Sequence, residues 1–441
     1  MSGFSLDRED EFSRGARTVL VLPQIDRDSS FDVSARLEEG RGLALAIGLN
    51  VISSHAYRVR APRAATLLGG GQVEEIAQIV ADGEAELLIV DAQLSAIQQR
   101  NLEDKIGVKV IDRTVLILEI FGERAATAEG RLQVELAHLD YQAGRLVRSW
   151  THLERQRGGF GFLGGPGETQ IEADRRLIRD RMAKLRRELE DVRRTRTLHR
   201  DRRQRAPWPV IALVGYTNAG KSTLFNRLTD SDVMAEDLLF ATLDPTMRQI
   251  ALPGLDKAIL SDTVGFVSDL PTELIAAFRA TLEEVTAADL IVHVRDIAHE
   301  ESEGQRDNVI AILKDLGVNG EGEDDPIPMV EVWNKIDLLP EERRDELHAI
   351  AQYDDNVLMI SAAEGTGVEN MAEALSARLT EHDVERSIIL PSADGKMLAW
   401  LHENGRVIDQ QVRGEDMVID VRMSLRNWGR FRRFDQDLDA R

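Results

Sequence analysis

The chain of 441 residues contains no cysteine. Disulfide bonds and thiolate metal ligands are therefore excluded. The nine histidines include no pair at the spacing of zinc ligands, so we predict no structural metal ion. A chain without these cross-links depends on its hydrophobic cores, and its 43% of hydrophobic residues is ordinary for a globular protein.

The sequence also lacks a long apolar run. No stretch reaches the roughly 18 consecutive apolar residues that suggest a membrane-spanning helix. The first 14 residues are polar and acidic, unlike a secretory signal peptide. We therefore expect a cytoplasmic protein with no stable membrane insertion.

Basic residues are in the minority, with 55 Lys and Arg against 77 Asp and Glu, for a formal net charge of −22. Because nucleic-acid phosphates are neutralised by Lys and Arg, this charge argues against indiscriminate binding, and we expect no DNA partner. Residues 175–205 differ, since fourteen Arg or Lys stand against five Asp or Glu, a local charge of about +9. A solvated helix face and an arm that faces RNA phosphates both account for this segment.

The hydrophobic pattern predicts an α/β protein with four regions. In residues 1–127, short apolar runs alternate with amphipathic stretches, as in βα units with a mostly parallel sheet. In residues 207–382, the same alternation predicts a doubly wound α/β domain. Its start follows from Pro207 and Pro209, which cannot continue the preceding helix. In residues 383–441, the pattern predicts a small C-terminal α/β domain.

Residues 128–206 predict a long helical hairpin. Three leucines between residues 132 and 139 follow helical spacing, and so does the apolar series from Ile171 to Val192. Two helices with such stripes can pair antiparallel. Six of the ten residues Gly158–Gly167 are glycine, which predicts a tip whose backbone can approach a crowded surface. The G-x-G-x-x-G match at Gly159–Gly164 follows a charged segment instead of a strand, so we discount a dinucleotide site there.

Residues Gly215–Ser222 match the phosphate-binding motif G-x-x-x-x-G-K-[ST], between the predicted strand VIALV and a predicted helix. The glycines let backbone N–H groups converge on a β-phosphate, and the helix N-terminus adds positive potential. Lys221 is expected to bridge β- and γ-phosphate oxygens, and the Ser222 hydroxyl to bind Mg²⁺.

The sequence Asn334-Lys335-Ile336-Asp337 ends the predicted strand MVEVW and points to guanine. The Asp337 carboxylate can accept hydrogen bonds from the guanine N1–H and 2-amino group, which adenine does not present in this arrangement. Lys335 is expected to lie along the base, and Asn334 to join this loop to the phosphate-binding loop. After the next predicted strand, Ser361-Ala362-Ala363 can offer backbone N–H groups to guanine O6.

Two further segments have the spacing of γ-phosphate sensors. Asp262-Thr263-Val264-Gly265 follows a predicted strand, so Asp262 is expected to hold Mg²⁺ through water and the Gly265 N–H to contact the γ-phosphate. In the segment Phe240–Thr246, Thr242 is our first choice for the switch threonine that binds Mg²⁺, and Thr246 is the alternative.

The predicted nucleotide site comprises Gly215, Tyr216, Thr217, Asn218, Ala219, Gly220, Lys221, Ser222, Phe240, Ala241, Thr242, Leu243, Asp244, Asp262, Thr263, Val264, Gly265, Asn334, Lys335, Ile336, Asp337, Ser361, Ala362 and Ala363. Within it, Ser222 and Thr242 are the predicted Mg²⁺ ligands. Many GTPases carry a water-orienting glutamine where this chain has Phe266. A phenyl ring cannot orient water, so the catalytic group stays unassigned and slow intrinsic hydrolysis is expected.

These elements in this order resemble the translation-factor-related GTPases, and FATLDPT with DTVGF narrows the resemblance to the Obg–HflX group. Three segments look like signatures of the HflX family, namely Phe121–Tyr141, Gly165–Arg176 and Leu390–Gly405. The glycine-rich N-terminal domain of the Obg type is absent. The resemblance implies a GTPase that binds the large ribosomal subunit, including its RNA, and in some members splits ribosomes under stress. We expect a monomer that binds GTP and GDP.

A small-molecule kinase would leave the NKID and SAA motifs without a role. A GTP-regulated binding module that acts on a non-ribosomal protein or RNA target stays open. In some GTPases of this wider class an asparagine at the position of Asn218 helps to coordinate K⁺, so K⁺ is a candidate second cofactor; otherwise Asn218 only shapes the loop. The sequence does not decide whether the N-terminal domain binds ATP.

Overall fold

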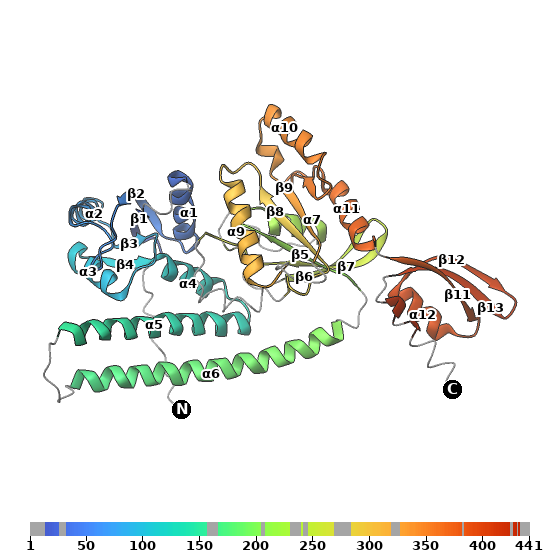
Figure 1. The fold of residues 1–441 in the computed structure, drawn as a ribbon, viewed down its shortest axis with the longest axis horizontal. Helices are drawn as coiled ribbons and strands as arrows, with labels where there is room; N and C mark the ends of the chain where they lie inside the picture. Colours follow the sequence, from blue (N-terminus) through green and yellow to red (C-terminus); the bar gives the residue numbers. More distant parts are fainter. Residues whose placement is uncertain are drawn as a thin grey trace.

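The computed structural model describes residues 14–25, 32–156, 166–203, 208–229, 240, 246–268, 284–318, 327–381, 383–423, 427–429 and 431–432, without the side chains of 146–172, 174, 193, 195–203 and 403. Figure 1 shows three α/β units in a row, with two long helices beneath the first two units. This arrangement confirms the predicted α/β architecture, with a central doubly wound unit, a long helical hairpin and a small C-terminal unit.

The N-terminal unit is a parallel sheet in the order β2-β1-β3-β4. All four residues of β3 are buried, as expected for a parallel strand covered on both faces. At the start of α3, Ser95 and Gln98 form a capping box, and Gly107 at φ +84° ends that helix. The elements of this unit are β1 (Arg17–Ile25), α1 (Val33–Ala46), β2 (Asn50–Val59), α2 (Gly70–Asp82), β3 (Leu87–Val90), α3 (Ala96–Ile106), β4 (Lys109–Asp112) and α4 (Arg113–Arg124).

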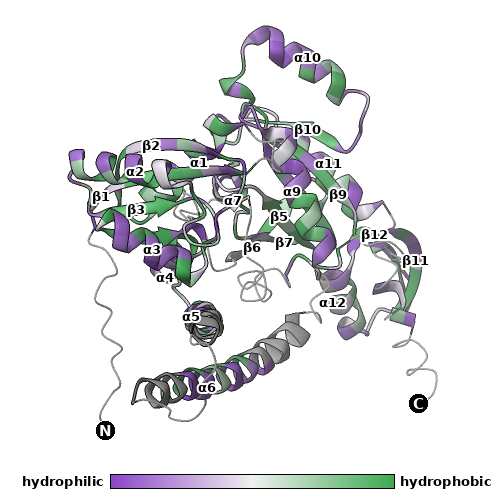
Figure 2. Ribbon diagram, turned by 60° about the vertical axis from the view of Figure 1, so that its left-hand side comes forward, coloured by the Kyte–Doolittle hydropathy of each residue, from purple (hydrophilic) through white to green (hydrophobic). Residues whose placement is uncertain are grey.

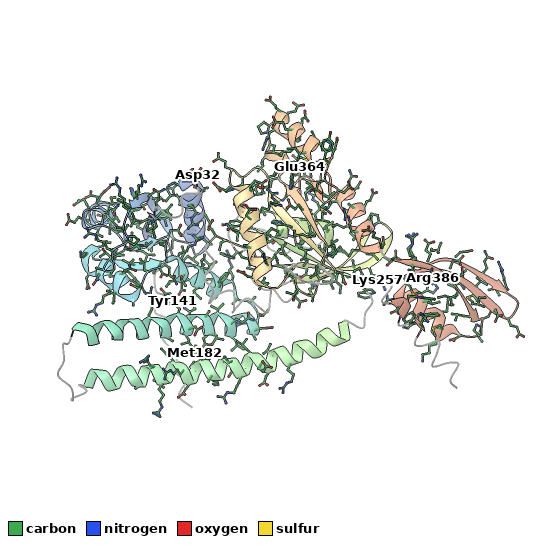
Figure 3. All side chains as sticks on the ribbon, viewed as in Figure 1. Asp32, Tyr141, Met182, Lys257, Glu364 and Arg386 are labelled. Atoms are coloured by element: carbon green, nitrogen blue, oxygen red, sulfur yellow. The ribbon has the colours of Figure 1, made fainter. Side chains whose placement is uncertain are left out.

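The hairpin consists of α5 (Ala128–Gln156) and α6 (Pro166–Arg203). Leu139, Met182 and Leu185 are buried between the helices, where the predicted apolar stripes meet; Met182 is labelled in Figure 3. In the part of α6 that Figure 2 colours by hydropathy, many residues are hydrophilic. Residues 158–165 of the predicted tip lie outside the described residues.

A buried carboxylate joins the hairpin to the N-terminal sheet. Asp112 caps α4 by accepting the Val115 N–H at 2.9 Å, and its other oxygen accepts bonds from the Leu94 N–H, the Tyr141 hydroxyl and the Arg145 guanidinium. The last two donors lie on α5, 29 and 33 residues further along the chain. Burial and the nearby Asp112 charge raise the pKa of Tyr141, so its hydroxyl stays a donor. These bonds fix the middle of α5 to the sheet.

Replacing Arg145 with Met is expected to lower the free energy of unfolding by about 2 kcal/mol, because a charged donor to a buried carboxylate is lost. Arg181→Met is the matched control, since Arg181 forms an exposed ion pair with Glu135 on the same hairpin. Such pairs contribute less than about 1 kcal/mol. Urea unfolding of both variants tests the difference, and equal losses would contradict the account.

The central unit has the strand order β10-β9-β8-β5-β7-β6, with β6 antiparallel to β7 and the other pairs parallel. The sequence pattern predicts no strand here, and only Thr246, the first residue of β6, has a predicted role there, as the alternative switch threonine. Its exposed residues alternate with the buried Ile250 and Leu252. The elements are β5 (Val210–Gly215), α7 (Lys221–Thr229), β6 (Thr246–Leu252), β7 (Leu255–Asp262), β8 (Leu290–Asp296), α9 (Ser302–Asp315), β9 (Met329–Asn334), η1 (Ile336–Leu338), α10 (Glu341–Ala351), β10 (Val357–Met359) and α11 (Val368–Thr380).

The C-terminal unit is an antiparallel sheet in the order β11-β13-β12, packed on α12 through a core that includes Leu401 and Ile419. Its elements are β11 (Val384–Pro391), α12 (Gly395–Asn404), β12 (Arg406–Arg413) and β13 (Asp416–Met423). Across the described parts of the chain, none of the helices combines the length and the apolar character of a membrane span. The domain limits at residues 127, 206 and 382 stay predictions.

Candidate nucleotide site

The predicted phosphate-binding loop connects β5 to α7 at the carboxyl edge of the central sheet. Two of its glycines are required by close contacts. A Cβ on Gly215, which has φ +151°, would lie 2.2 Å from the Val294 carbonyl oxygen. A Cβ on Gly220, at φ +92°, would lie 2.2 Å from the Asn334 amide nitrogen. The loop therefore presses against β8 and β9.

Lys221 lies at the start of α7 and is 6% exposed. Its ammonium group donates to the Tyr216 carbonyl at 2.7 Å. Burial lowers the pKa of Lys221 to about 8, although the nearby Asp262 charge opposes this shift. An anion placed against Lys221 would supply the missing negative charge and raise the pKa again.

This shift predicts proton uptake when a guanine nucleotide binds. With a pKa near 8, a substantial fraction of the Lys221 side chains is expected to be neutral at pH 8 in the empty protein, and bound phosphates are expected to restore the proton. Affinity should therefore change little below about pH 7 and fall toward tenfold per pH unit above pH 8. Calorimetric titration with GDP at pH 8, in buffers of different ionisation enthalpy, should show uptake of a substantial fraction of a proton. A binding enthalpy independent of buffer would contradict this prediction.

Oxygen ligands for a divalent cation lie beside the lysine. The Ser222 hydroxyl donates to the Asp262 carboxylate at 2.8 Å, and hydroxyl and carboxylate oxygens are ligands that Mg²⁺ prefers. Ser222 and Asp262 thus fit the predicted ion. Thr246 is the first residue of β6 and lies opposite Asp262 in the strand pair. Residues 241–245, with the preferred Thr242, lie outside the described residues, so the choice between the two threonines stays open.

The loop after β9 carries the residues predicted to read the base. The Asn334 amide donates to the Ala219 carbonyl at 2.8 Å, and its carbonyl accepts the Ala362 N–H at 2.9 Å. Asn334 therefore joins three predicted segments, the phosphate loop, the NKID loop and the SAA loop. Lys335 has φ +67° and forms an ion pair with Asp296 at 2.7 Å.

Asp337 follows in the short helix η1. Its Oδ1 atom is buried and has no hydrogen-bond partner within the described ranges. A buried acceptor without a partner is costly, which suits a carboxylate that accepts hydrogen bonds from a ligand. The arrangement fits the two donors of guanine.

The segment after Asp262 lies directly against the phosphate loop. The Phe266 N–H donates to the Gly215 carbonyl at 3.1 Å, and the Thr217 N–H donates to the Phe266 carbonyl at 2.8 Å. A Cβ on Gly265 would lie 2.7 Å from the Thr217 methyl group and 3.1 Å from the Lys221 ammonium. Gly265 is therefore close enough to Lys221 to respond to a phosphate bound there.

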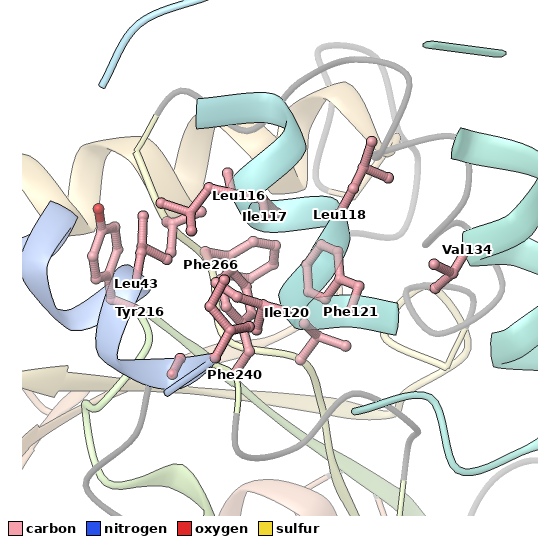
Figure 4. Packing of buried hydrophobic residues seen from close by; sticks show 14 of the residues in the cluster. Leu43, Leu116, Ile117, Leu118, Ile120, Phe121, Val134, Tyr216, Phe240 and Phe266 are labelled. Atoms are coloured by element: carbon pink, nitrogen blue, oxygen red, sulfur yellow. The ribbon is translucent and has the colours of Figure 1, made fainter. Parts of the chain in front are cut away.

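Phe266 stands at the chain position of the water-orienting glutamine, but its side chain is buried in a hydrophobic core and does not reach the site. Its side chain is 3% exposed and belongs to a hydrophobic core shared by the N-terminal and central units. Phe240, from the other predicted switch segment, is 2% exposed in the same core. It meets Phe121 of α4 edge-on, with ring centroids 4.6 Å apart. Figure 4 shows both phenylalanines among the side chains of α4.

A buried polar cluster lies next to this core, at the carboxyl edge of the N-terminal sheet. Arg113 forms ion pairs with Glu39 of α1 and with Asp91, which follows β3. The Glu39 carboxylate accepts bonds from the Tyr216 hydroxyl at 2.6 Å and the Ser268 hydroxyl at 2.7 Å. Parallel α/β domains commonly bind ligands at this edge. In this protein the edge binds the central unit instead, through Tyr216 of the phosphate loop and Ser268, which lies two residues after Phe266.

The charges of this polar cluster are held in place by one another. Burial alone would raise the pKa of Glu39, but Arg113 and the two hydroxyl donors outweigh burial and keep that pKa below its ordinary value. Burial and the Glu39 charge raise the pKa of Tyr216. Sequence reasoning missed Glu39 and Arg113, because nothing in their local sequence distinguishes them from surface charges on amphipathic helices.

Comparisons with known proteins identify the family. Family models described as GTP-binding GTPase N-terminal, GTP-binding GTPase middle region, 50S ribosome-binding GTPase and HflX C-terminal domain match residues 34–122, 124–203, 210–335 and 346–433. GTPase HflX of Magnetococcus marinus is 48% identical over 394 residues, 89% of this chain and 88% of that protein. GTPase HflX of Escherichia coli is 40% identical over 427 residues, 96% of each chain.

Among solved structures, the crystal structure of SsGBP in complex with GDP covers 83% of this chain and 99% of its own, at 24% identity and a TM-score of 0.47. The family itself is shown by the sequence matches. Four family models follow one another along the chain, and relatives with up to 48% identity cover most of it. The chain belongs to the HflX family of GTPases, and it binds guanine nucleotides and hydrolyses GTP.

Proposed function

We propose that this protein associates with the large ribosomal subunit in its GTP-bound state and acts as a ribosome-splitting or rescue factor under stress. The observation that carries the proposal is the burial of Phe240 and Phe266, one from each predicted switch segment, in a core shared with α4. The hairpin helix α5 begins four residues after α4 ends. A nucleotide that moves the switch segments therefore acts on the unit that carries the hairpin.

Within the nucleotide site, we assign the phosphates to the loop Gly215–Ser222 and the guanine edge to Asp337. Mg²⁺ would be held by Ser222 directly and by Asp262 through water, with Thr242 or Thr246 as the switch threonine. This ion would neutralise charge on the phosphates. Gly265 is assigned to the γ-phosphate because it lies beside Lys221. K⁺ beside Asn218 stays a prediction, which a comparison of GTPase rates in KCl and NaCl at equal ionic strength would test.

The burial of Phe266 affects how the attacking water is oriented for GTP hydrolysis. A side chain that packs between domains cannot orient the attacking water, so another group has to supply this function. Removing a positioned catalytic group costs orders of magnitude in rate. We therefore propose slow hydrolysis by the isolated protein and faster hydrolysis on its target. The comparison of GTPase turnover with and without large ribosomal subunits checks this step.

The hairpin is proposed to make the contact with ribosomal RNA. Several arginines of α6 are exposed, among them Arg176, Arg179, Arg186 and Arg187, within the segment of about +9 charge. Phosphate contacts of this kind position a protein on RNA and weaken with salt. The binding should therefore fall steeply as salt rises, with a slope reduced by roughly one for each lost contact.

Sedimentation with purified large subunits tests the proposal. The parent should bind more tightly with a GTP analogue than with GDP. A variant in which Gly158–Gly167 is replaced by a short Ser-rich turn should lose most of this binding while it still hydrolyses GTP. If that folded variant keeps its GTP-dependent binding, the tip is not a principal contact.

The alternative function is a GTP-regulated module that binds a non-ribosomal protein or RNA. Under this alternative, the same sedimentation shows no binding in either nucleotide state. A pull-down with and without the GTP analogue would then recover another partner in the GTP state alone.

A further inference from the structure

Arg227 lies in the last turn of α7 and reaches the loop assigned to guanine O6. Its Nε donates to the Ala362 carbonyl at 2.6 Å, and its Nη2 donates to the Ala363 carbonyl. The two carbonyls belong to adjacent residues of the SAA motif, 135 and 136 residues further along the chain. A planar guanidinium suits this pair of carbonyls because it holds its N–H donors in a fixed fork.

Several backbone N–H groups of the turn at residues 361–366 donate to acceptors within the same turn. The Ser361 N–H donates to the Thr366 carbonyl, the Gly365 N–H to the Ser361 carbonyl, and the Glu364 N–H to the Ser361 hydroxyl. The Ala362 N–H donates to Asn334. For the Ala363 N–H, no partner occurs in the part of the chain that the structure describes. Ala363 is also exposed, so its N–H remains available to a ligand.

The Ala363 N–H and the Ala362 carbonyl belong to one peptide group. Because a peptide group is planar and trans, its N–H points opposite to its C=O. Arg227 therefore fixes the direction of the Ala363 N–H by binding the carbonyl on the other side. A cationic donor on that carbonyl also polarises the peptide and strengthens the N–H as a donor.

The surrounding backbone adapts to the arginine. Gly365 has φ +94°, and a Cβ there would lie 2.6 Å from Arg227 Nη1. The guanidinium thus packs over the turn at Gly365. Any other residue at this position would have to push the guanidinium away. Nothing in the sequence GKSTLFNRLT singles out this arginine, because a helix commonly ends with a basic residue that is solvated.

We propose that Arg227 is a positioning residue that determines specificity for guanine O6 by orienting the Ala362–Ala363 peptide. The inference rests on the proposed role of the SAA loop in base recognition. It predicts that loss of the arginine weakens only the binding of bases that carry an oxygen at position 6. A purely structural arginine would weaken all nucleotides alike.

The experiment compares the parent with Arg227→Ala in binding three diphosphates. GDP carries O6 and the 2-amino group, IDP carries O6 without the amino group, and 2-aminopurine riboside diphosphate carries the amino group without O6. The variant should bind GDP and IDP about fivefold more weakly, the size of one neutral hydrogen bond. Its affinity for the 2-aminopurine nucleotide should stay unchanged, and GDP should dissociate about fivefold faster.

Arg378→Ala is the matched control. Arg378 is a half-buried arginine of the central unit and also donates to a loop carbonyl, that of Asp355, at 3.3 Å. Its loss should leave all three affinities unchanged. Equal losses for the three nucleotides in Arg227→Ala, or no loss at all, would overturn the proposal. If the parent itself binds GDP and the 2-aminopurine nucleotide equally, the SAA loop does not recognise O6, and it is the proposed role of that loop that is wrong.

The Arg227→Lys variant, which keeps the charge but lacks the fork, should recover only part of the discrimination.

Discussion

Replacing Asp337 with Asn is expected to weaken GTP binding by about 5- to 150-fold and to shift the preference toward xanthine nucleotides. The structure gives the reason, since the buried Asp337 Oδ1 has no partner in the described part of the chain. An amide there cannot accept from both guanine donors, and an unpaired buried group costs about 1–3 kcal/mol. The amide can instead donate to the 2-oxo group of xanthine.

Affinities for GTP and XTP, measured by competition against a fluorescent nucleotide, check this prediction. Asp345→Asn on the exposed face of α10 is the control, because it makes the same chemical change away from the loop. Its affinities should equal those of the parent. If Asp337→Asn binds GTP within about threefold of the parent, the assignment of Asp337 is wrong.

A second large effect is expected at the interface between the N-terminal and central units. Replacing Glu39 with Ala removes the acceptor of Tyr216 and Ser268 and one of the two carboxylates that form ion pairs with Arg113. Breaking a buried ion pair by removing one partner costs about 3–5 kcal/mol. We expect a loss of about 3 kcal/mol in the free energy of unfolding, because Arg113 keeps Asp91.

Urea unfolding followed by circular dichroism measures this loss. The control is Glu301→Gln, since Glu301 also connects the two units, through the Asp32 N–H at 3.1 Å, but in an exposed position. That variant should lose less than about 1 kcal/mol. A loss of this small size in Glu39→Ala would mean that the polar cluster contributes little to docking of the units.

The parts that could be predicted from the sequence have local signals. The phosphate loop, NKID and SAA are short motifs, and the structure brings all three together through Asn334. The stripes of the hairpin were equally readable, because the residues that pack between α5 and α6 recur at helical spacing.

Other features have no local signal. The contact between Glu39 and Tyr216 spans 177 residues, and Arg227 reaches its loop over 135 residues. Phe266 could be recognised as a departure from the usual glutamine, but its burial against the N-terminal unit depends on how the domains dock. Strand β6 was missed because its first residue had been considered as a switch threonine and its seven residues bury only two side chains.

We propose that the bound nucleotide, acting through the switch segments, sets the position of the hairpin. The absence of cysteine allows two labels to be placed without removing native thiols. Glu190→Cys on α6 and Glu342→Cys on α10 are exposed positions on the hairpin and the central unit. Spin labels at these sites should give different distance distributions with GDP and with a non-hydrolysable GTP analogue. Identical distributions in the two states would contradict the account.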